Sequence, residues 1–381
     1  MRLAVYTDYT YHRVGDEVYA ERAFALFLAG LRAYVERLVL VGRLSPSGGE
    51  GRYPVGDDVE LIGLPFYPSL AKPLQALPAF ARSLAVFWRS LADVDCVWLL
   101  GPHPLALAFA FLARARGRRV VLGVRQDLPA YARSRHPGRR SLPLAAAALE
   151  RMFRLLGRFV PVVAVGPELA ANYGRSRELL EIAVSLVGEG DVVSPEAALE
   201  RDYRGELRML SVGRLEKEKN PLLLADILAT LNEDNPRWRL VVCGEGELAD
   251  ALEARLGELG QAGRAELRGY VAFGAELLAL YRESHLLLHT SWTEGFPAVL
   301  PEAFAAGLPV VAADVGGIAE AVGDSALLVP PDDPLAAASA AVSVADDAVT
   351  RERLVRAGNA YALAHTTEAE TARLAAFLLA A

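Results

Sequence analysis

Cysteine is nearly absent from this sequence. Its 381 residues include only two, Cys96 and Cys243, and each lies inside an apolar, strand-like run. Two isolated thiols of this kind supply neither a disulfide framework nor a cysteine zinc site. We therefore expect a protein of a reducing compartment.

The sequence also lacks an apolar run suited to crossing a membrane. Its most apolar long stretch, 96–113, is interrupted by Gly101-Pro102-His103-Pro104, which predicts a strand, a loop and a helix instead. The N-terminus, MRLAVYTDY, reads as a short strand and has no charged start, apolar stretch and cleavage site of a signal peptide. From these two absences we expect a cytoplasmic protein.

No tract of biased composition occurs either. Apolar residues make up 53% of the chain and charged residues 23%, which excludes intrinsic disorder and collagen-like or coiled-coil architectures. At about 100 to 200 residues per domain, the length indicates two domains or one large one.

The net charge of −7 conceals an asymmetry between the two halves. Residues 1–190 carry 24 Lys and Arg against 17 Asp and Glu, whereas the remainder carries 16 against 30. The basic half suggests contact with an anionic membrane surface or an acidic acceptor, although such runs are more often solvated helix ends. Nucleic acid is not an expected partner, because the whole chain is acidic and the runs lack interleaved aromatics. The arginines gather at Arg114, Arg116, Arg118 and Arg119, and again at Arg133, Arg135, Arg139 and Arg140.

Strand-like apolar runs alternate with helical patterns in both halves. This alternation predicts an α/β fold with parallel sheets, in two Rossmann-like doubly wound domains, 1–190 and 191–366, joined by a Gly-, Asp- and Pro-rich linker over 187–200. In the first half we expect strands over 3–7, 37–42, 96–101, 119–125 and 160–166, and helices over 20–34 and 104–115. In the second half we expect strands over 207–213, 239–244, 265–271, 285–291 and 309–314, and helices over 221–231, 248–259 and 298–306.

Ligands of open α/β sheets bind beyond the carboxyl ends of the strands, so functional residues are sought there. The strand 207–213 ends in Gly213, and Arg214 and Lys219 precede a helix that begins at Pro221. A guanidinium and an ammonium at the mouth of a helix suit a diphosphate. A basic loop before a helix is common, however. This pattern alone is therefore consistent with either a diphosphate site or an ordinary solvated loop.

A second candidate segment is 293–297, which leads into a short helix. Glu294 in the loop and Glu302 in the helix are eight positions apart, so both can face a ligand at the helix N-terminus. Glu294 can accept hydrogen bonds from sugar hydroxyls and Glu302 from ribose hydroxyls, while free N–H groups over 296–299 meet phosphate. The alternative is that Glu302 only complements the helix dipole.

Four pieces of the second half then resemble, in order, the C-terminal domain of retaining glycosyltransferases of family 4. They are VGRLEKEKNP, VVCGEGEL, LRGYV and SWTEGFPAVLPEAFAAGLPVVAADVGG, within about residues 207–330, and the last contains the Glu-x7-Glu motif. The resemblance implies a GT-B fold with a cleft between its two domains. It also implies sugar transfer from a nucleotide-diphosphate sugar, UDP- or GDP-linked, to a hydroxyl acceptor, with no bound cofactor. The first half matches more loosely.

The resemblance implies roles for individual residues. Arg214 and Lys219 would hold the donor diphosphate and stabilise the leaving group without a metal, Glu294 would contact the transferred sugar, and Glu302 the ribose. The final helix, within 367–381, would pack back on the first domain. The other donor contacts implied are Gly213, Arg268, Tyr270, Val271, Gly295, Phe296, Pro297, Ala298 and Val299.

The family retains the configuration of the anomeric carbon, and this sequence offers no obvious enzymic nucleophile. This combination favours front-face displacement, in which the departing phosphate accepts the proton of the acceptor hydroxyl. A double displacement needs a carboxylate opposite the sugar, and Asp127 is the one weak candidate.

The first half departs from the family at two places. Where members carry a glycine pair in the first βα loop, only Gly15 is retained, and where a histidine usually follows the strand over 119–125, this chain has Arg125, Gln126 and Asp127. We therefore expect Arg125 and Asp127 as sugar or acceptor contacts. His103 is a further candidate, the alternative being a loop histidine bonded to backbone.

No metal site is expected, because His285 and His289 lack a third ligand. Two other functions stay open: a GT-B epimerase or phosphorylase, and a non-catalytic sugar-nucleotide-binding scaffold that has lost its N-terminal chemistry. The four ordered pieces argue against the first, while the missing glycine pair and histidine motivate the second. The acceptor is either lipid-linked and near a membrane, or a soluble metabolite.

Overall fold

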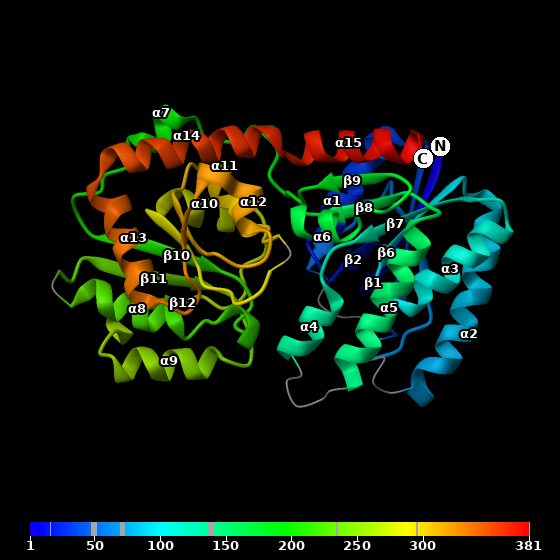
Figure 1. Ribbon diagram of the computed structural model, residues 1–381, viewed down its shortest axis with the longest axis horizontal. Helices are drawn as coiled ribbons and strands as arrows, with labels where there is room; N and C mark the ends of the chain where they lie inside the picture. The colour runs from blue at the N-terminus through cyan, green and yellow to red at the C-terminus, as the bar shows by residue number, and fades with distance from the viewer. Residues whose placement is uncertain are drawn as a thin grey trace. The chain divides into compact units, whose positions relative to one another are not determined.

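The computed structural model describes residues 1–15, 17–46, 52–68, 73–135, 141–233, 235–294 and 296–380 (Figure 1). Within these ranges the chain divides into two compact units. The first contains residues 1–133, 141–184 and 367–380, and the second contains residues 185–366.

The division between the units falls between Val184 and Ser185, ahead of the expected linker. The reason is that the segment 187–200 is folded against the second unit. Its helix α7 (Pro195–Leu199) packs on α14 (Ala348–Ala364), and a backbone hydrogen bond ties Val193 to the end of helix α11.

The first unit is built on a nine-stranded sheet. Its parallel part has the order β5-β3-β1-β6-β7-β8-β9, and the direction of strand addition reverses between β1 and β6. This pair therefore marks the switch point of the unit, where open α/β sheets bind ligands. The strands are β1 (Arg2–Val14), β2 (Glu17–Ala20), β3 (Arg37–Leu44), β4 (Tyr53–Pro54), β5 (Glu60–Leu64), β6 (Cys96–Gly101), β7 (Arg119–Val124), β8 (Val162–Val165) and β9 (Leu179–Ile182).

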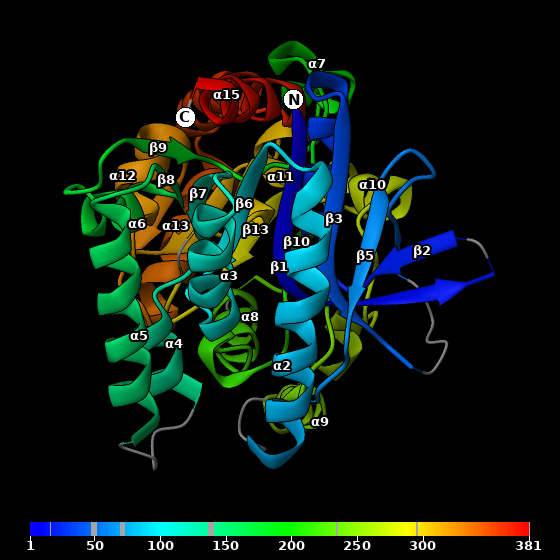
Figure 2. The same cartoon turned by 90° about the vertical axis from the view of Figure 1, so that its right-hand side faces the viewer.

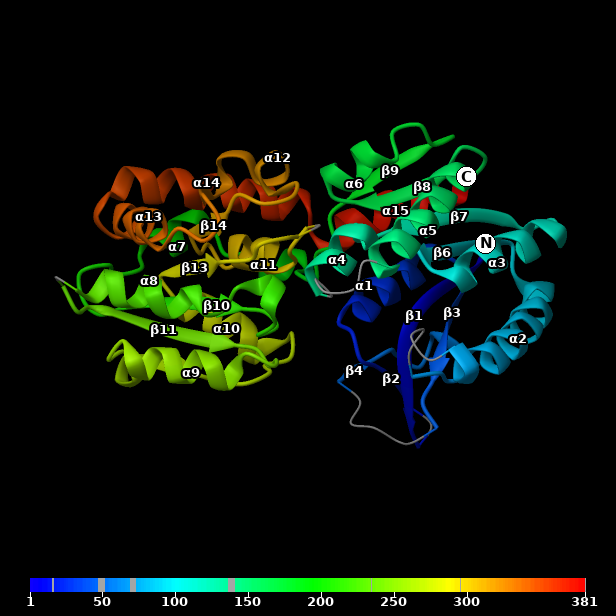
Figure 3. The same ribbon diagram turned by 60° about the horizontal axis from the view of Figure 1, so that its bottom comes forward.

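Strand β1 continues well past the expected 3–7. It runs to Val14 and pairs antiparallel with β2, and this hairpin projects from the sheet (Figures 2 and 3). Gly15 occupies the turn with φ +63°, a left-handed conformation that glycine adopts without strain. The helix expected over 20–34 consequently starts late and is divided into α1 (Phe24–Gly30) and a 3-10 turn, η1 (Leu31–Tyr34).

Helices cover the sheet of the first unit, with α2, α3 and α5 together on one face (Figures 1 and 2). Ala4 and Tyr6 of β1 belong to the core under these helices, whereas Leu3 and Val5 are buried on the opposite face, as strand alternation requires. Helix α15 packs against α1 and β9. The remaining helices are α2 (Pro73–Ser90), η2 (Leu91–Asp93), α3 (Pro104–Ala115), α4 (Leu128–Arg135), α5 (Ser141–Gly157), α6 (Pro167–Asn172) and α15 (Thr367–Ala380).

The second unit has a fully parallel six-stranded sheet. The order β12-β11-β10-β13-β14-β15 is the 3-2-1-4-5-6 order of a Rossmann fold, with its switch point between β10 and β13. The strands are β10 (Leu207–Val212), β11 (Trp238–Cys243), β12 (Ala265–Leu267), β13 (Leu286–His289), β14 (Val310–Ala313) and β15 (Leu327–Val329). The helices are η3 (Glu189–Asp191), η4 (Lys217–Lys219), α8 (Leu223–Asn232), α9 (Ala249–Glu258), η5 (Ala262–Arg264), α10 (Ala275–Glu283), α11 (Val299–Ala305), α12 (Ile318–Val322), η6 (Gly323–Ser325) and α13 (Pro334–Asp346), besides α7 and α14.

Each face of this second sheet has its own core. Leu207 and Met209 of β10 pack with α8, α9 and α13, whereas Leu210 packs with α10, α11 and α12. The prediction of an α/β fold with two Rossmann-like units is thus confirmed. In the part of the chain that the structure describes, no helix is both long and apolar enough to span a bilayer.

Candidate active site

The loops that follow β10 and β11 pack so closely that side chains are excluded between them. A Cβ on Gly244 would lie 1.8 Å from the carbonyl oxygen of Gly213, and one on Gly246 would lie 2.3 Å from that of Leu215. The Leu215 N–H also donates to the carbonyl oxygen of Glu245 at 2.8 Å. The backbone that carries Arg214 is therefore held in one position at the carboxyl end of β10.

The guanidinium of Arg214 is oriented by two carboxylates of its own loop. Nη2 donates to Oε1 of Glu218 at 2.8 Å, and Nη1 donates to Oε2 of Glu216. Glu218 is buried, while the Arg214 side chain is partly exposed. The two carboxylates thus hold the guanidinium in one orientation, and part of the side chain remains exposed to solvent.

Lys219, from the same loop, meets Glu294, which follows β13. Its Nζ donates to Oε1 of Glu294 at 2.5 Å, and the same oxygen accepts from Ser291 Oγ at 2.7 Å and lies 3.0 Å from His289 Nε2. Burial alone would raise the pKa of Glu294, but the ammonium of Lys219 and the bonded imidazole outweigh it and hold the pKa well below its ordinary value. Glu294 is therefore an ionised carboxylate at neutral pH.

Backbone contacts tie the two loops together across the switch point. Thr290 Oγ1 donates to the carbonyl oxygens of Lys219 and Asn220, at 3.0 and 3.2 Å, and the Trp292 N–H donates to that of Glu218 at 2.9 Å. Asn220 itself adopts a left-handed conformation, φ +48°. The structure therefore brings together Arg214, Lys219 and Glu294, all named from the sequence.

Glu302 has a different environment on helix α11. It is only 5% exposed, and its Oε2 accepts a hydrogen bond from the Tyr281 hydroxyl at 2.7 Å. Burial raises the pKa of Glu302 to about 7, with the Tyr281 bond acting against that rise. Near neutral pH this carboxyl is therefore divided between its protonated and ionised forms.

The other donor contacts expected from the sequence lie in two further loops, one after β12 and one after β13. Arg268 follows β12 and donates through Nε to Glu266 at 2.7 Å, and the next residue, Gly269, has φ +67° and accepts from the Gly244 N–H at 2.7 Å. This bond places the segment that includes Tyr270 and Val271 beside the loop after β11. The second loop is 296–299: no side chain caps α11 there, and Phe296, Pro297, Ala298 and Val299 precede or open that helix. Gly295 lies outside the described residues.

In the first unit, His103 is the centre of a buried hydrogen-bond network at the switch point. Its Nδ1 lies 2.9 Å from the Tyr6 hydroxyl and accepts from the Leu105 N–H at 3.2 Å, which caps α3, while Nε2 lies 3.2 Å from the Tyr67 hydroxyl. Tyr67 in turn donates to Asp8 Oδ1 at 2.6 Å. Burial lowers the pKa of His103, although Asp8 acts against this shift. The His103 side chain is 6% exposed, and both of its ring nitrogens have partners within the unit. Because its pKa is lowered, the ring is neutral at neutral pH.

Asp127 and Arg125 follow β7. Asp127 Oδ1 accepts from the Ala130 N–H at 2.6 Å and so caps the first turn of α4. The Arg125 guanidinium lies over the Phe24 ring, 3.5 Å from its centroid. Gly15, at the tip of the β1–β2 hairpin, belongs to a turn rather than to a loop leading into a helix.

His285, just before β13, and His289, at its end, have different partners. His289 contacts Glu294, whereas His285 Nδ1 accepts from the Arg208 N–H at 3.0 Å and its Nε2 lies near the carbonyl oxygen of Asp202. Over the described ranges no group of three His, Cys, Asp or Glu side chains could hold a metal ion.

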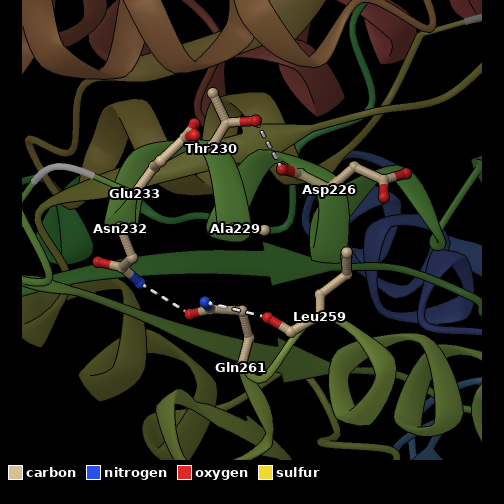
Figure 4. Close-up of a pocket in the computed structure, with 7 residues that line it drawn as sticks. All are labelled: Asp226, Ala229, Thr230, Asn232, Glu233, Leu259 and Gln261. Atoms are coloured by element: carbon tan, nitrogen blue, oxygen red, sulfur yellow. Dashed lines mark hydrogen bonds between the residues drawn. The ribbon is translucent and has the colours of Figure 1, made fainter.

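A hollow of about 420 Å³ lies elsewhere in the second unit, at the end of α8 (Figure 4). Two of its polar side chains are bonded within it: Asn232 donates to Gln261 Oε1 at 3.1 Å, and Thr230 donates to the backbone carbonyl of Asp226 at 2.9 Å. Because it lies at the amino end of β11, away from the switch point, we do not assign a ligand to it.

Comparison with known proteins points to the same part of the chain. Residues 200–361 match the family model of "Glycosyl transferases group 1". A D-inositol 3-phosphate glycosyltransferase of Corynebacterium glutamicum is 36% identical over 151 residues, which cover 38% of this chain and 36% of that protein. The chain thus matches only about a third of the length of this relative.

Solved structures match the whole chain at lower identity. The sucrose-phosphate synthase of Thermosynechococcus elongatus has a TM-score of 0.76 at 19% identity, over 100% of this chain and 99% of that one. HepE of Anabaena, solved in complex with UDP-glucose, has a TM-score of 0.72 at 17% identity, over 100% and 99% of the two chains. The chain has the GT-B fold, and its residues 200–361 carry the group 1 glycosyl transferase sequence pattern.

Proposed function

We propose that this protein is a retaining glycosyltransferase that moves a sugar from a nucleotide-diphosphate sugar to a hydroxyl acceptor. The observation that carries the proposal is the cluster of Arg214, Lys219 and Glu294 at the switch point of β10 and β13. Two cations and an ionised carboxylate, held by separate loops at the place where this fold binds nucleotides, suit a charged diphosphate joined to a polyhydroxylated sugar.

In this proposal the second unit binds the donor. Arg214 and Lys219 receive the diphosphate, Glu294 accepts hydrogen bonds from hydroxyls of the transferred sugar, and Glu302 accepts from the ribose. The loop of Arg268, Tyr270 and Val271 holds the base, and the segment 295–299 supplies backbone N–H groups to phosphate and sugar.

The chemical step requires charge stabilisation above all. The bond from the anomeric carbon to the diphosphate oxygen breaks, the acceptor oxygen bonds to that carbon from the same face, and the hydroxyl proton passes to the departing phosphate. Arg214 and Lys219 offset the negative charge that develops on the diphosphate. Asp127 already uses one oxygen as a helix cap, so the proposal assigns it to acceptor positioning rather than to nucleophilic attack.

A UDP- or GDP-sugar is the proposed co-substrate. The complex of HepE with UDP-glucose, a protein of the same fold, supports the uridine form. The acceptor belongs to the first unit, with Gly15, His103 and Arg125 near or at its binding face.

Donor hydrolysis separates this proposal from a non-catalytic scaffold. A transferase releases sugar slowly to water in the absence of acceptor, and Glu294→Ala should abolish that release while leaving the protein folded. A scaffold would release no sugar from any of the UDP- and GDP-linked donors tested, even though it binds the nucleotide.

We also propose that the first unit associates peripherally with an anionic membrane, from the cytoplasmic side. Large apolar side chains are exposed on α2, α3 and α5, which lie side by side (Figures 1 and 2), and exposed arginines accompany them on α5. Apolar side chains mixed with cations are typical of surfaces that bind the bilayer interface. The exposed apolar residues on these helices are Leu77, Phe111, Leu144, Met152 and Leu155, and the arginines on α5 are Arg151 and Arg154; Arg158 and Phe159, also exposed, follow the end of α5.

Sedimentation with phosphatidylglycerol vesicles tests this surface. Leu155→Glu should reduce the bound fraction at low salt, whereas Leu335→Glu, at a likewise exposed position of α13 in the second unit, should not. Absence of binding by the unaltered protein at low salt would remove the membrane from the proposal, and a soluble acceptor would replace it.

A further inference from the structure

Arg125 carries a charge for which the described part of the chain offers no counter-ion. It stands directly after β7, and its guanidinium carbon lies 3.5 Å from the centroid of Phe24 and 5.7 Å from that of Tyr9. Its Nε is shut off from solvent and has no hydrogen-bond partner. Among the described residues, the rings of Phe24 and Tyr9 face this cation, and no carboxylate is paired with it.

Two other arginines of the first unit with partly buried side chains are paired with carboxylates. Arg2 donates to Asp95 at 2.7 Å, and Arg43 lies 3.4 Å from Asp8. The unpaired state of Arg125 is therefore a particular feature of its place in the fold rather than a general property of this basic unit.

The isolation of Arg125 is energetically unfavourable. Burial lowers the pKa of Arg125 to about 9, with no nearby carboxylate acting against the shift, so the group still bears its charge at pH 7. Contact with an aromatic face stabilises a desolvated cation only in part, because the rings supply neither an opposite charge nor a strong hydrogen-bond acceptor. The residue as a whole is nevertheless of intermediate exposure rather than buried.

We propose that Arg125 binds an anionic group, a phosphate or carboxylate, of the acceptor substrate. The planar guanidinium matches either group with two parallel hydrogen bonds. Its strand ends one place along the sheet from β6, at the edge where the first unit has its switch point. This inference rests on the proposed function, in which the first unit receives the acceptor, and it narrows the acceptor to a negatively charged molecule.

The neighbouring residues of the same edge suit the uncharged part of such an acceptor. Asp8 is 37% exposed, and its Oδ1 is held by Tyr67 at 2.6 Å and by Arg43 at 3.4 Å. An oriented carboxylate accepts hydrogen bonds from sugar or polyol hydroxyls. Arg125 would then select the anion, and Asp8 would orient hydroxyls.

The first experiment needs no turnover and uses inorganic phosphate as the probe. The full chain is saturated with whichever of UDP and GDP binds it more tightly, so that the donor site is filled, and its Tm is compared in 50 mM phosphate and in sodium chloride of equal ionic strength. We expect phosphate to raise the Tm by about 2 °C, Arg125→Gln to abolish that rise, and Arg125→Lys to retain part of it. Arg177→Gln, which removes an exposed arginine of the same unit, is the matched control.

Each outcome of that experiment decides the inference. A rise that persists in Arg125→Gln, or no rise in the unaltered protein, would overturn the anion site even if the protein proves to be a transferase. An increase of more than about fivefold in the nucleotide Kd of Arg125→Gln, roughly 1 kcal/mol, would overturn the acceptor assignment, because the anion would then be the donor diphosphate.

The second experiment tests the substrate class directly. Transfer is measured to a monosaccharide, to its phosphate monoester and to its uronate. Arg125→Gln should raise KM for one of the two charged acceptors by at least tenfold with kcat nearly unchanged, and should leave the neutral sugar unaffected. Equal use of all three acceptors by the unaltered protein would overturn the inference, whereas slow donor hydrolysis would still uphold the proposed function.

Discussion

The ammonium nitrogen of Lys219 and Oε1 of Glu294 lie 2.5 Å apart, although 75 positions separate the two residues in the chain. Lys219 follows β10 and Glu294 follows β13, so the ion pair joins the two loops at the switch point of the second sheet. Glu294 is 9% exposed and Lys219 is 24% exposed. A ligand that binds here would meet two opposite charges that are paired with each other.

Removing Lys219 should leave Glu294 as an unpaired buried charge. We expect Lys219→Met to lower the free energy of unfolding by about 3 kcal/mol, and Lys219→Met combined with Glu294→Gln to recover most of that loss. Urea denaturation measures both. Lys217→Met, at an exposed position of the same loop, serves as control and should change little. Equal losses in the single and double variants would contradict a coupled pair.

In the proposed donor site, Glu216 would compete with a diphosphate for Arg214. Because it takes one edge of the guanidinium, Glu216→Gln should tighten nucleoside diphosphate binding by about threefold to tenfold at low salt, and less at high salt. Calorimetric titration measures the effect. Glu283→Gln, which breaks an exposed pair with Arg208, should leave the affinity unchanged. Weaker binding by Glu216→Gln would mean that this carboxylate positions Arg214 rather than competing for it.

Glu302 should make stability depend on pH in a defined direction. Its pKa is about 7 in the folded protein and 4.5 in an ordinary environment, so between these values the folded state binds more protons than the unfolded state. Stability from this group therefore falls as pH rises from about 4.5 to 7, and is constant above that range. Relative to Glu302→Gln, the protein should lose about 3 kcal/mol across this window. Urea titrations at pH 5 and pH 8 measure the difference, and a constant gap would contradict the buried, neutral carboxyl.

The close packing of the loops after β10 and β11 predicts opposite effects at two glycines. Gly244→Ala places a methyl group against the Gly213 carbonyl and should destabilise the second unit by at least about 2 kcal/mol and abolish nucleotide binding. Gly257→Ala, in α9 with open space around it, should stabilise by about 0.5 to 1 kcal/mol. Thermal unfolding of both variants with and without nucleotide provides the test. Tolerance of Gly244→Ala would contradict the packing.

Much of the fold followed from hydrophobic patterning. The helix expected over 104–115 is α3 (Pro104–Ala115), because a proline start and a continuous apolar face leave few alternatives. The central parallel strands of both sheets were equally clear. The sequence did not predict β2, β4, β5, β9 and β15, which are two to five residues long and depend on a partner strand for their existence. Nor did it predict that β1 would continue into a hairpin.

The residues of the candidate site were predictable where a single segment of sequence shows a charged residue in a loop after a strand. Arg214, Lys219 and Glu294 are each marked by a loop after a strand, and the structure brings them together. The contacts of His289 and Ser291 with Glu294 were not predictable, because they require the strand end and its loop to fold back on one carboxylate. Asp8, Tyr67 and His103 illustrate the same limit: three distant segments meet only once the first sheet is assembled.

The most direct test of the account is calorimetric titration of the purified protein and of Arg214→Ala with UDP, GDP, ADP and dTDP. We predict tight binding of one nucleotide, UDP or GDP, and its loss in Arg214→Ala, since a diphosphate held at the end of β10 depends on that guanidinium. No binding of any nucleotide, or equal binding by the variant, would contradict a donor site at the junction of β10 and β13.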